Sequence, residues 1–332
     1  MKKFLWAAIY GTALTAFTVY IALDTFVLSR KLQTNAGEMN SSMFHGTEEN
    51  NSSMPYGTEE NNSSMPHGTE EISGSMPHDT EGNTDSASEA QEPEADYASG
   101  HVSITLTEYN WNNTDIYVAD VQVDSAEYLK TAFAENTYGR NVKEKTSSIA
   151  ASNDAVFAVN GDYYGAQERG IVIRNGVAYR ENSDGDDIFC LYADGTMKTI
   201  RSNSKSADEL VEEGVWQAWN FGPSLVEDGG IVISEKDEVD KAMASNPRTA
   251  IGMIDSCHYV FVVSDGRTRE SEGLSLYELA QFMLPLGVQT AYNLDGGGSS
   301  TMYFEGMIVN KPTTNGTIKE RRVSDIIYIG RE

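Results

Sequence analysis

Five polar clusters, each following or preceding an apolar run, contain the side chains most able to do chemistry. They span residues 160–164, 220–224, 246–249, 264–267 and 293–300. Because strands that deliver polar residues to their ends commonly build a binding or catalytic site, we expect these clusters to converge. Each cluster also suits an ordinary turn, since Asp-Gly and Asn-Gly are common turn residues.

The last cluster contains three consecutive glycines, preceded by an aspartate and followed by two serines. Such a run loses much backbone entropy on folding, but it lets backbone N–H groups approach an anion closely. It matches neither the common phosphate-binding loops nor a nucleophile elbow. We therefore predict a ligand-binding loop with the residues Asn293, Gly296, Gly297, Gly298, Ser299 and Ser300.

Two arginines stand beside predicted strand ends in a domain whose cations are outnumbered. The guanidinium groups of Arg248 and Arg267 suit a phosphate or carboxylate ligand, and a structural pair with a buried carboxylate is the alternative. Only His101 and His258 remain for a folded domain, because the other histidines lie in a repeat region. This count excludes a multi-histidine metal site.

Charge and hydropathy divide the chain. It has 332 residues and a formal net charge of -26, which disfavours binding to nucleic acid. Residues 4–28 are apolar enough to cross a bilayer, so residues 1–31 are predicted to be an uncleaved transmembrane anchor; a signal peptide is the alternative. No Lys or Arg occurs between Lys31 and Lys130, which favours a single-pass membrane protein with an extracytoplasmic C-terminal domain.

Residues 32–98 contain repeats of eleven residues, marked by Met43, Met54, Met65 and Met76. Their Ser, Gly, Asn, Glu and Pro content buries too little apolar surface to offset chain entropy. We predict a disordered acidic stalk, followed by one domain over residues 99–332. Cys190 and Cys257 are predicted to form either one disulfide or two inert thiols.

Hydrophobic periodicity predicts mostly strands in residues 99–332. Hairpins are expected where apolar runs flank Asn-Gly, Asp-Gly and Glu-Gly turns. Short helices are expected at residues 126–133, 208–213 and 275–286. The fold class is therefore α+β, with a single domain built on mixed or antiparallel sheet.

The clusters, in this order, resemble the phosphodiester glycosidase family. The matching stretches run from Ala155 to the end of the chain and include AVNGDYYG, GIVIRNG, NFGPSLVEDG, NPRTAIGM, SDGR, NLDGGGSS and RRVSDIIYIG. NLDGGGSS is the most specific of them. The resemblance implies an extracytoplasmic enzyme that hydrolyses the bond between a sugar C1 and a phosphate oxygen in a surface glycan, exopolysaccharide or wall polymer.

The resemblance also implies roles for the polar residues. Glycosidases generally use carboxylates, so Asp295 is the leading catalytic group, as base or nucleophile, with Asp162 and Asp265 as further candidates. Neutralising the phosphate would fall to Arg248, Arg267 and the glycine amides, while sugar hydroxyls would be oriented by Asn160, Tyr163 and Asn293. A Ca²⁺ or Mg²⁺ ion on the three aspartates is compatible with oxygen-only ligands.

Two other functions are compatible with the same residues. One is a non-catalytic surface module that binds an anionic wall polysaccharide without cleaving it. The other is a serine hydrolase that uses Ser299 or Ser300, with His101 or His258 as its base.

Overall fold

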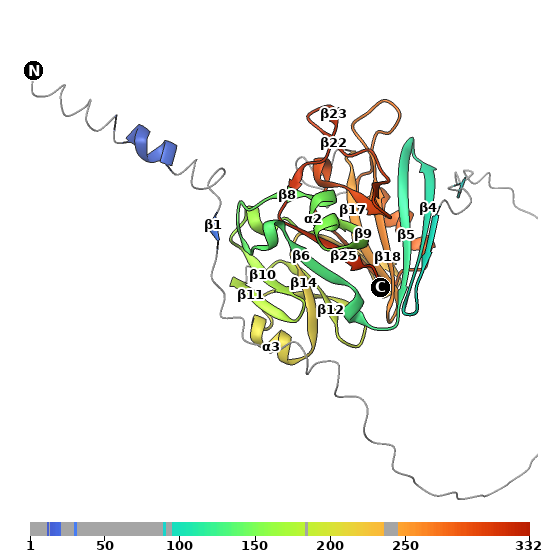
Figure 1. Ribbon diagram of the computed structural model, residues 1–332, viewed down its shortest axis with the longest axis horizontal. Helices are drawn as coiled ribbons and strands as arrows, with labels where there is room; N and C mark the ends of the chain where they lie inside the picture. Colours follow the sequence, from blue (N-terminus) through green and yellow to red (C-terminus); the bar gives the residue numbers. More distant parts are fainter. Residues whose placement is uncertain are drawn as a thin grey trace, which may run out of the picture.

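Antiparallel β-sheets pack around a shared apolar core (Figure 1). The computed structural model describes residues 12, 14–20, 30–31, 89–90, 95–182, 185–235 and 245–332. Every strand pairing within these residues is antiparallel. Of the two predicted kinds of sheet, mixed and antiparallel, the structure therefore has the antiparallel kind.

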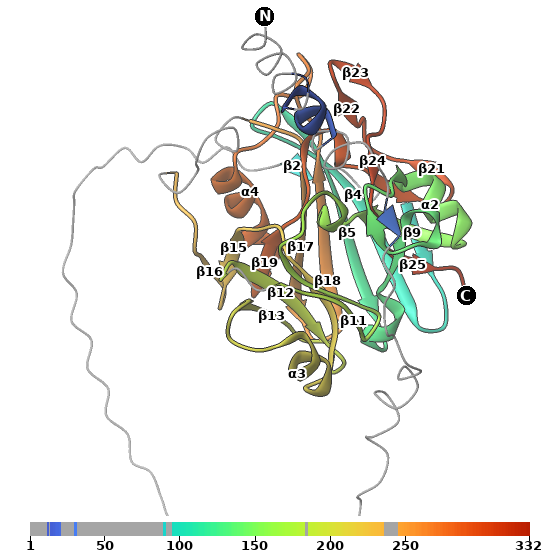
Figure 2. The same ribbon diagram turned by 90° about the vertical axis from the view of Figure 1, so that its left-hand side faces the viewer.

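The largest sheet has nine strands, and its long central strands lie side by side in Figure 2. In spatial order it contains β16 (Gly230–Ile231), β15 (Ser224–Glu227), β19 (Thr290–Asn293), β17 (Arg248–Asp255), β18 (His258–Ser264), β5 (Thr114–Val123), β4 (Val102–Trp111) and β2 (Glu89–Ala90), with β3 (Ala95–Ala98) also paired to β4. One face is covered by α4 (Leu276–Met283), whose Phe282 packs on Tyr109 and Trp111 of β4.

Two further sheets have five strands each. The first contains β11 (Val177–Asn182), β10 (Gly170–Arg174), β14 (Val215–Trp219), β12 (Asp187–Tyr192) and β13 (Met197–Arg201). The second contains β21 (Met307–Ile308), β20 (Met302–Phe304), β9 (Ala155–Asn160), β25 (Asp325–Gly330) and β6 (Lys130–Phe133). Two-stranded ladders pair β1 (Arg30–Lys31) with β7 (Gly139–Arg140), β22 (Thr313–Thr314) with β23 (Thr317–Ile318), and β24 (Arg322–Val323) with β8 (Glu144–Lys145).

The remaining helices are short. They are α2 (Thr146–Ser152), α3 (Ala207–Glu212) and the 3-10 turns η1 (Ala126–Tyr128), η2 (Ala134–Asn136), η3 (Tyr164–Ala166), η5 (Leu284–Leu286) and η6 (Gly297–Ser299). The predicted helix at residues 126–133 is wrong beyond η1, because residues 130–133 pair with β25 as strand β6. Tertiary pairing outweighs local helix propensity there.

Aromatic side chains connect the three sheets. Phe157 of β9 packs on Phe261 of β18 with ring centroids 5.0 Å apart, and Phe189 of β12 stacks on Tyr292 of β19 at 5.2 Å. All four are fully buried and belong to one core. Because this packing fixes the sheets relative to one another, it also fixes the strand ends that bear the polar clusters.

Much of the N-terminal third lies outside the described residues, including nearly all of the repeats and most of the apolar segment 4–28. Residues 12 and 14–20 of that segment are helical. Within the part of the chain that the structure describes, no helix is long and apolar enough to cross a membrane. At the other end of the predicted stalk, β2 and β3 both pair with β4 in the nine-stranded sheet, so strands of the domain reach back to Glu89. Cys190 and Cys257 are both free thiols.

Candidate active site

A buried ion network occupies the end of the molecule where the sheets meet. Arg174, at the end of β10, donates from Nη2 to Asp162 at 2.7 Å and from Nε to Asp325 at 2.9 Å, and all three side chains are almost wholly buried. Asp162 also accepts the N–H groups of Tyr164 and Asn220. The predicted catalytic candidate Asp162 is therefore an ion-pair partner that joins three segments of the chain.

Two asparagines predicted to orient a sugar donate hydrogen bonds to the chain. Asn160 donates to the carbonyl of Asp295 at 2.6 Å and accepts from the Thr249 hydroxyl at 2.9 Å. Asn293 donates to the carbonyl of Gly222 at 2.7 Å. Both side chains are buried, and these bonds hold the loop that follows β19, whereas Oδ1 of Asn293 has no hydrogen-bond partner among the described residues.

Asp295 lies in that loop and carries the carboxyl group best suited to chemistry. Its side chain is nearly buried, with 8% of the residue exposed. Burial raises the pKa of Asp295 to about 6, against the opposing effects of the Ser299 hydroxyl, the positive charge of Arg321 and the Gly296 N–H. A carboxyl group held near neutrality can act as a base or an acid at physiological pH.

Two of the three glycines, Gly297 and Gly298, leave room for arginine side chains beside the loop. A methyl group at Gly297 would lie 3.2 Å from Nη2 of Arg267, and one at Gly298 would lie 3.0 Å from Nε of Arg321. Gly297 also has a φ of +64°, which favours glycine. Its N–H donates to the Pro247 carbonyl at 2.8 Å. The predicted anion site on three free amides therefore does not form, because the Gly296 and Gly297 amides are already engaged.

Three cations surround Asp295 and the glycine loop. Lys143 and Arg321 both interact electrostatically with Asp295, and Arg267 interacts with Arg321. Burial lowers the pKa of Lys143 and of Arg267. Nζ of Lys143 lies 5.7 Å from the ring centroid of Tyr163, which is 38% exposed and thus still available to a ligand. This group of cations can receive an anionic substrate next to a carboxyl group.

The other predicted residues lie nearby in supporting positions. Arg248 is buried and donates from Nε to the Leu274 carbonyl at 2.8 Å. Asp265 accepts from Asn310 at 3.0 Å and from the Lys311 N–H at 2.8 Å, and burial raises its pKa. Ser299 and Ser300 are fully buried within the glycine loop. These contacts shape the loops around Asp295.

Asp325, Arg321 and Lys143 were not among the predicted site residues. Asp325 is fully buried, and burial raises its pKa to about 7 despite the Arg174 guanidinium. It begins β25 within the RRVSDIIYIG stretch, which also contains Arg321, so that stretch contained the signal for both. Lys143 lies outside every matching stretch, and nothing in the sequence singled it out.

Two of the alternatives considered from the sequence need particular groups of side chains. A metal site needs a cluster of ligands, and a serine hydrolase needs a histidine base beside its serine. Within the described residues, no group of three or more His, Cys, Asp or Glu side chains is placed to hold a metal ion. His101 pairs with Asp124, and His258 pairs with Asp120. His258 begins β18, whereas Asp265 follows its other end, a separation of about 20 Å at the usual rise of a strand. Of the two histidines that the structure describes, each is paired with an aspartate, and neither is hydrogen-bonded to Ser299 or Ser300.

Fold and site together define an antiparallel β-sheet protein with a buried acid just beyond a strand end, beside several cations. The family model for phosphodiester glycosidases matches residues 153–330, and the chain belongs to that family.

Relatives and solved structures agree with this assignment. The chain is 29% identical over 198 residues to the SPbeta prophage-derived uncharacterized protein YomE of Bacillus subtilis, covering 58% of this chain and 30% of that protein. It is 35% identical over 144 residues to human N-acetylglucosamine-1-phosphodiester alpha-N-acetylglucosaminidase, covering 38% and 26%. The matches thus span less than a third of either relative.

The zebrafish N-acetylglucosamine-1-phosphodiester alpha-N-acetylglucosaminidase catalytic domain has the same fold. It superposes with a TM-score of 0.57 at 21% identity, covering 74% of this chain and 88% of that one. A hypothetical protein from Synechocystis gives a TM-score of 0.54 at 14% identity, covering 69% and 62%.

Proposed function

We propose that this protein hydrolyses the C1–O bond of a sugar-1-phosphodiester in a cell-surface glycan or glycopolymer. The observation that carries the proposal is Asp295, a buried carboxyl group with a pKa of about 6, placed beside Lys143 and Arg321. The names of the human and bovine relatives add that proteins with this domain act on an N-acetylglucosamine-1-phosphodiester.

The reaction needs one carboxylate and a group of positively charged side chains around the phosphate. The bond between C1 and the phosphate oxygen breaks, and its electron pair leaves with a phosphate monoester. Asp295 either accepts a proton from the water that attacks C1 or attacks C1 itself before water replaces it. Lys143, Arg267 and Arg321 stabilise the charge on the departing phosphate, so a strong general acid is less necessary.

The proposed place of action is outside the cytoplasm, on a single membrane anchor with residues 32–88 as a spacer. Support comes from the apolar segment 4–28 and from the absence of Lys and Arg between Lys31 and Lys130. Protease digestion of intact cells tests the location, since an enclosed domain would stay protected.

Hydrolysis in ¹⁸O-water tests which bond breaks. With the methyl diester of N-acetylglucosamine-1-phosphate as substrate, we expect free N-acetylglucosamine with ¹⁸O at C1, and unlabelled methyl phosphate. Attack at phosphorus would instead place the label in the phosphate-containing product. Mass spectrometry of both products separates the outcomes, and binding without any product would favour the non-catalytic surface module.

Gly298→Ala should reduce this activity without unfolding the domain. The added methyl group would lie 2.4 Å from the Thr314 hydroxyl oxygen, so Thr314 must move, and 3.0 Å from Nε of Arg321, so Arg321 must shift by a few tenths of an ångström. A displacement of about 1 Å at a site can cost about a hundredfold in rate. Since Arg321 shifts by less than this, we expect kcat/KM for sugar release to fall by roughly threefold to tenfold.

Gly100→Ala is the matched control, because nothing lies within 4 Å of a methyl group there. It should retain wild-type kcat/KM. Full activity in Gly298→Ala would contradict the role given to Arg321.

A further inference from the structure

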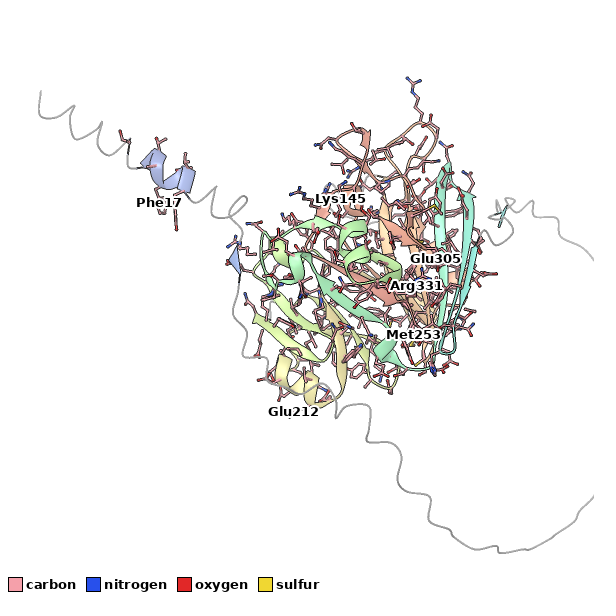
Figure 3. All side chains as sticks on the ribbon, in the orientation of Figure 1. Phe17, Lys145, Glu212, Met253, Glu305 and Arg331 are labelled. Atoms are coloured by element: carbon pink, nitrogen blue, oxygen red, sulfur yellow. The ribbon has the colours of Figure 1, made fainter. Side chains whose placement is uncertain are left out.

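Four cations follow one another beside the glycine loop and form what we call the cationic ladder: Lys143, Lys145, Arg321 and Arg322. Lys145 and Arg322 are directly opposite residues in the antiparallel pairing of strands β8 and β24. Both are exposed, and Figure 3 labels Lys145 at the domain surface. Like charges directly opposite in a sheet are destabilising, so this pair weakens the fold unless an anion joins it.

The two acids next to these cations in sequence, Glu144 and Glu320, form no ion pair with Lys145 or Arg322 within the described residues. The Glu144 carboxylate accepts the N–H of Glu135 at 3.0 Å. The Glu320 carboxylate accepts the N–H of Ser147 at 2.9 Å and its hydroxyl at 2.7 Å. Both acids are neighbours in sequence of the cations, yet each is held by another segment. Within the described residues, Lys145 and Arg322 form no ion pair.

Other surface cations of this acidic chain are mostly paired. Ion pairs join Arg140 to Glu168, Arg169 to Asp186, Arg201 to Asp187, Lys205 to Glu213, Lys311 to Asp115 and Arg331 to Glu305. Lys130, Lys198, Arg269 and Lys319 make no ion pair among the described residues, but none of them lies opposite another cation in a strand pairing. The cationic ladder is thus a local excess of positive charge in a chain of net charge -26.

We propose that Lys145 and Arg322 bind a second phosphate of a polymeric substrate, in which sugars are joined by repeating phosphodiester linkages. This inference rests on the proposed function, because Lys143 and Arg321 face the reacting phosphate beside Asp295. Lys145 lies two residues beyond Lys143, or about 7 Å along an extended chain. The next anionic group of such a polymer therefore falls within reach of the two outer cations.

The double variant Lys145→Ala/Arg322→Ala tests this subsite against two substrates. One is the single methyl diester of N-acetylglucosamine-1-phosphate, and the other is a synthetic tetramer of N-acetylglucosamine-1-phosphate units. We expect kcat/KM on the tetramer to fall about tenfold, the effect of two surface ion pairs, and kcat/KM on the single diester to stay within about twofold. The preference for the tetramer should also weaken with added salt in the wild type more than in the variant.

Lys130→Ala/Lys198→Ala is the charge-matched control and should leave both substrates unaffected. Equal losses on both substrates, or no loss on the tetramer, would overturn the subsite. If the wild type releases sugar from neither substrate, the proposed function fails, and tetramer binding measured by calorimetry decides the subsite separately. Binding that is weaker in Lys145→Ala/Arg322→Ala supports it, and equal binding refutes it.

Discussion

Asp295→Asn should lower kcat/KM for sugar release by about 10²–10⁴-fold, the range expected when a general acid or base is lost. Asparagine matches the carboxyl group in shape but neither exchanges a proton nor attacks C1. The measurement is free-sugar release under single-substrate kinetics. Asp228→Asn is the control, since Asp228 is an exposed turn residue whose left-handed backbone also suits asparagine.

Stability and pH separate a catalytic role for Asp295 from a structural one. The folded-state pKa of about 6 is raised above the ordinary value, so the folded protein loses stability as pH rises from about 4 to 6. The amide that Asp295→Asn introduces cannot ionise, so the variant should be at least as stable as the wild type at pH 8. Wild-type kcat/KM should rise about tenfold per pH unit below pH 6 and then level off. A marked fall in the melting temperature of Asp295→Asn would indicate a structural role instead.

Arg174→Met should have the largest effect on stability, a loss of about 3–5 kcal/mol in the free energy of unfolding. Methionine fills similar space, but it leaves Asp162 and Asp325 buried with no counter-charge from β10. Urea denaturation at pH 8 measures the loss. Arg201→Met is the control, because Arg201 pairs with Asp187 at the surface and should cost about 1 kcal/mol or less.

The loss in Arg174→Met should shrink at pH 5. Without the guanidinium, the folded-state pKa of Asp325 rises further, and its protonation then removes part of the uncompensated charge. Groups whose pKa is raised on folding stabilise the protein at low pH and cease to do so as pH increases. An equal loss at pH 5 and pH 8 would mean that packing, not charge, is what Arg174 provides.

The sequence predicted the local elements well where turns and caps are strong. Asn175-Gly176 forms the turn of the β10–β11 hairpin, with φ values of 51° and 74°. Ser275 and Glu278 form the predicted capping box of α4. These signals are local, so they survive in any context. Pairing partners are not local, and for this reason β6 was mistaken for a helix.

The candidate site was predicted by location more than by role. The sequence predicted that the polar clusters would converge, and Arg267 does lie beside the glycine loop that follows Asp295. Asn160 was expected to contact substrate. Its side-chain amide instead donates a hydrogen bond inside the fold to the carbonyl of Asp295, which is more than a hundred residues away in sequence. Sequence shows which side chains are polar, whereas only packing decides which of them face solvent.

The pairing of β2 and β3 with β4 has a mechanical consequence. The two strands meet β4 at Asn110–Tyr109 and at Leu106–Ser103, so the chain enters the domain as a ribbon laid along one edge of the largest sheet. Tension applied through the residues before Glu89 would peel this ribbon one pair at a time, beginning at Asn110. A pull from the N-terminal side would therefore first break the hydrogen bonds that β2 and β3 make with β4, before it strained the strands next to Asp295.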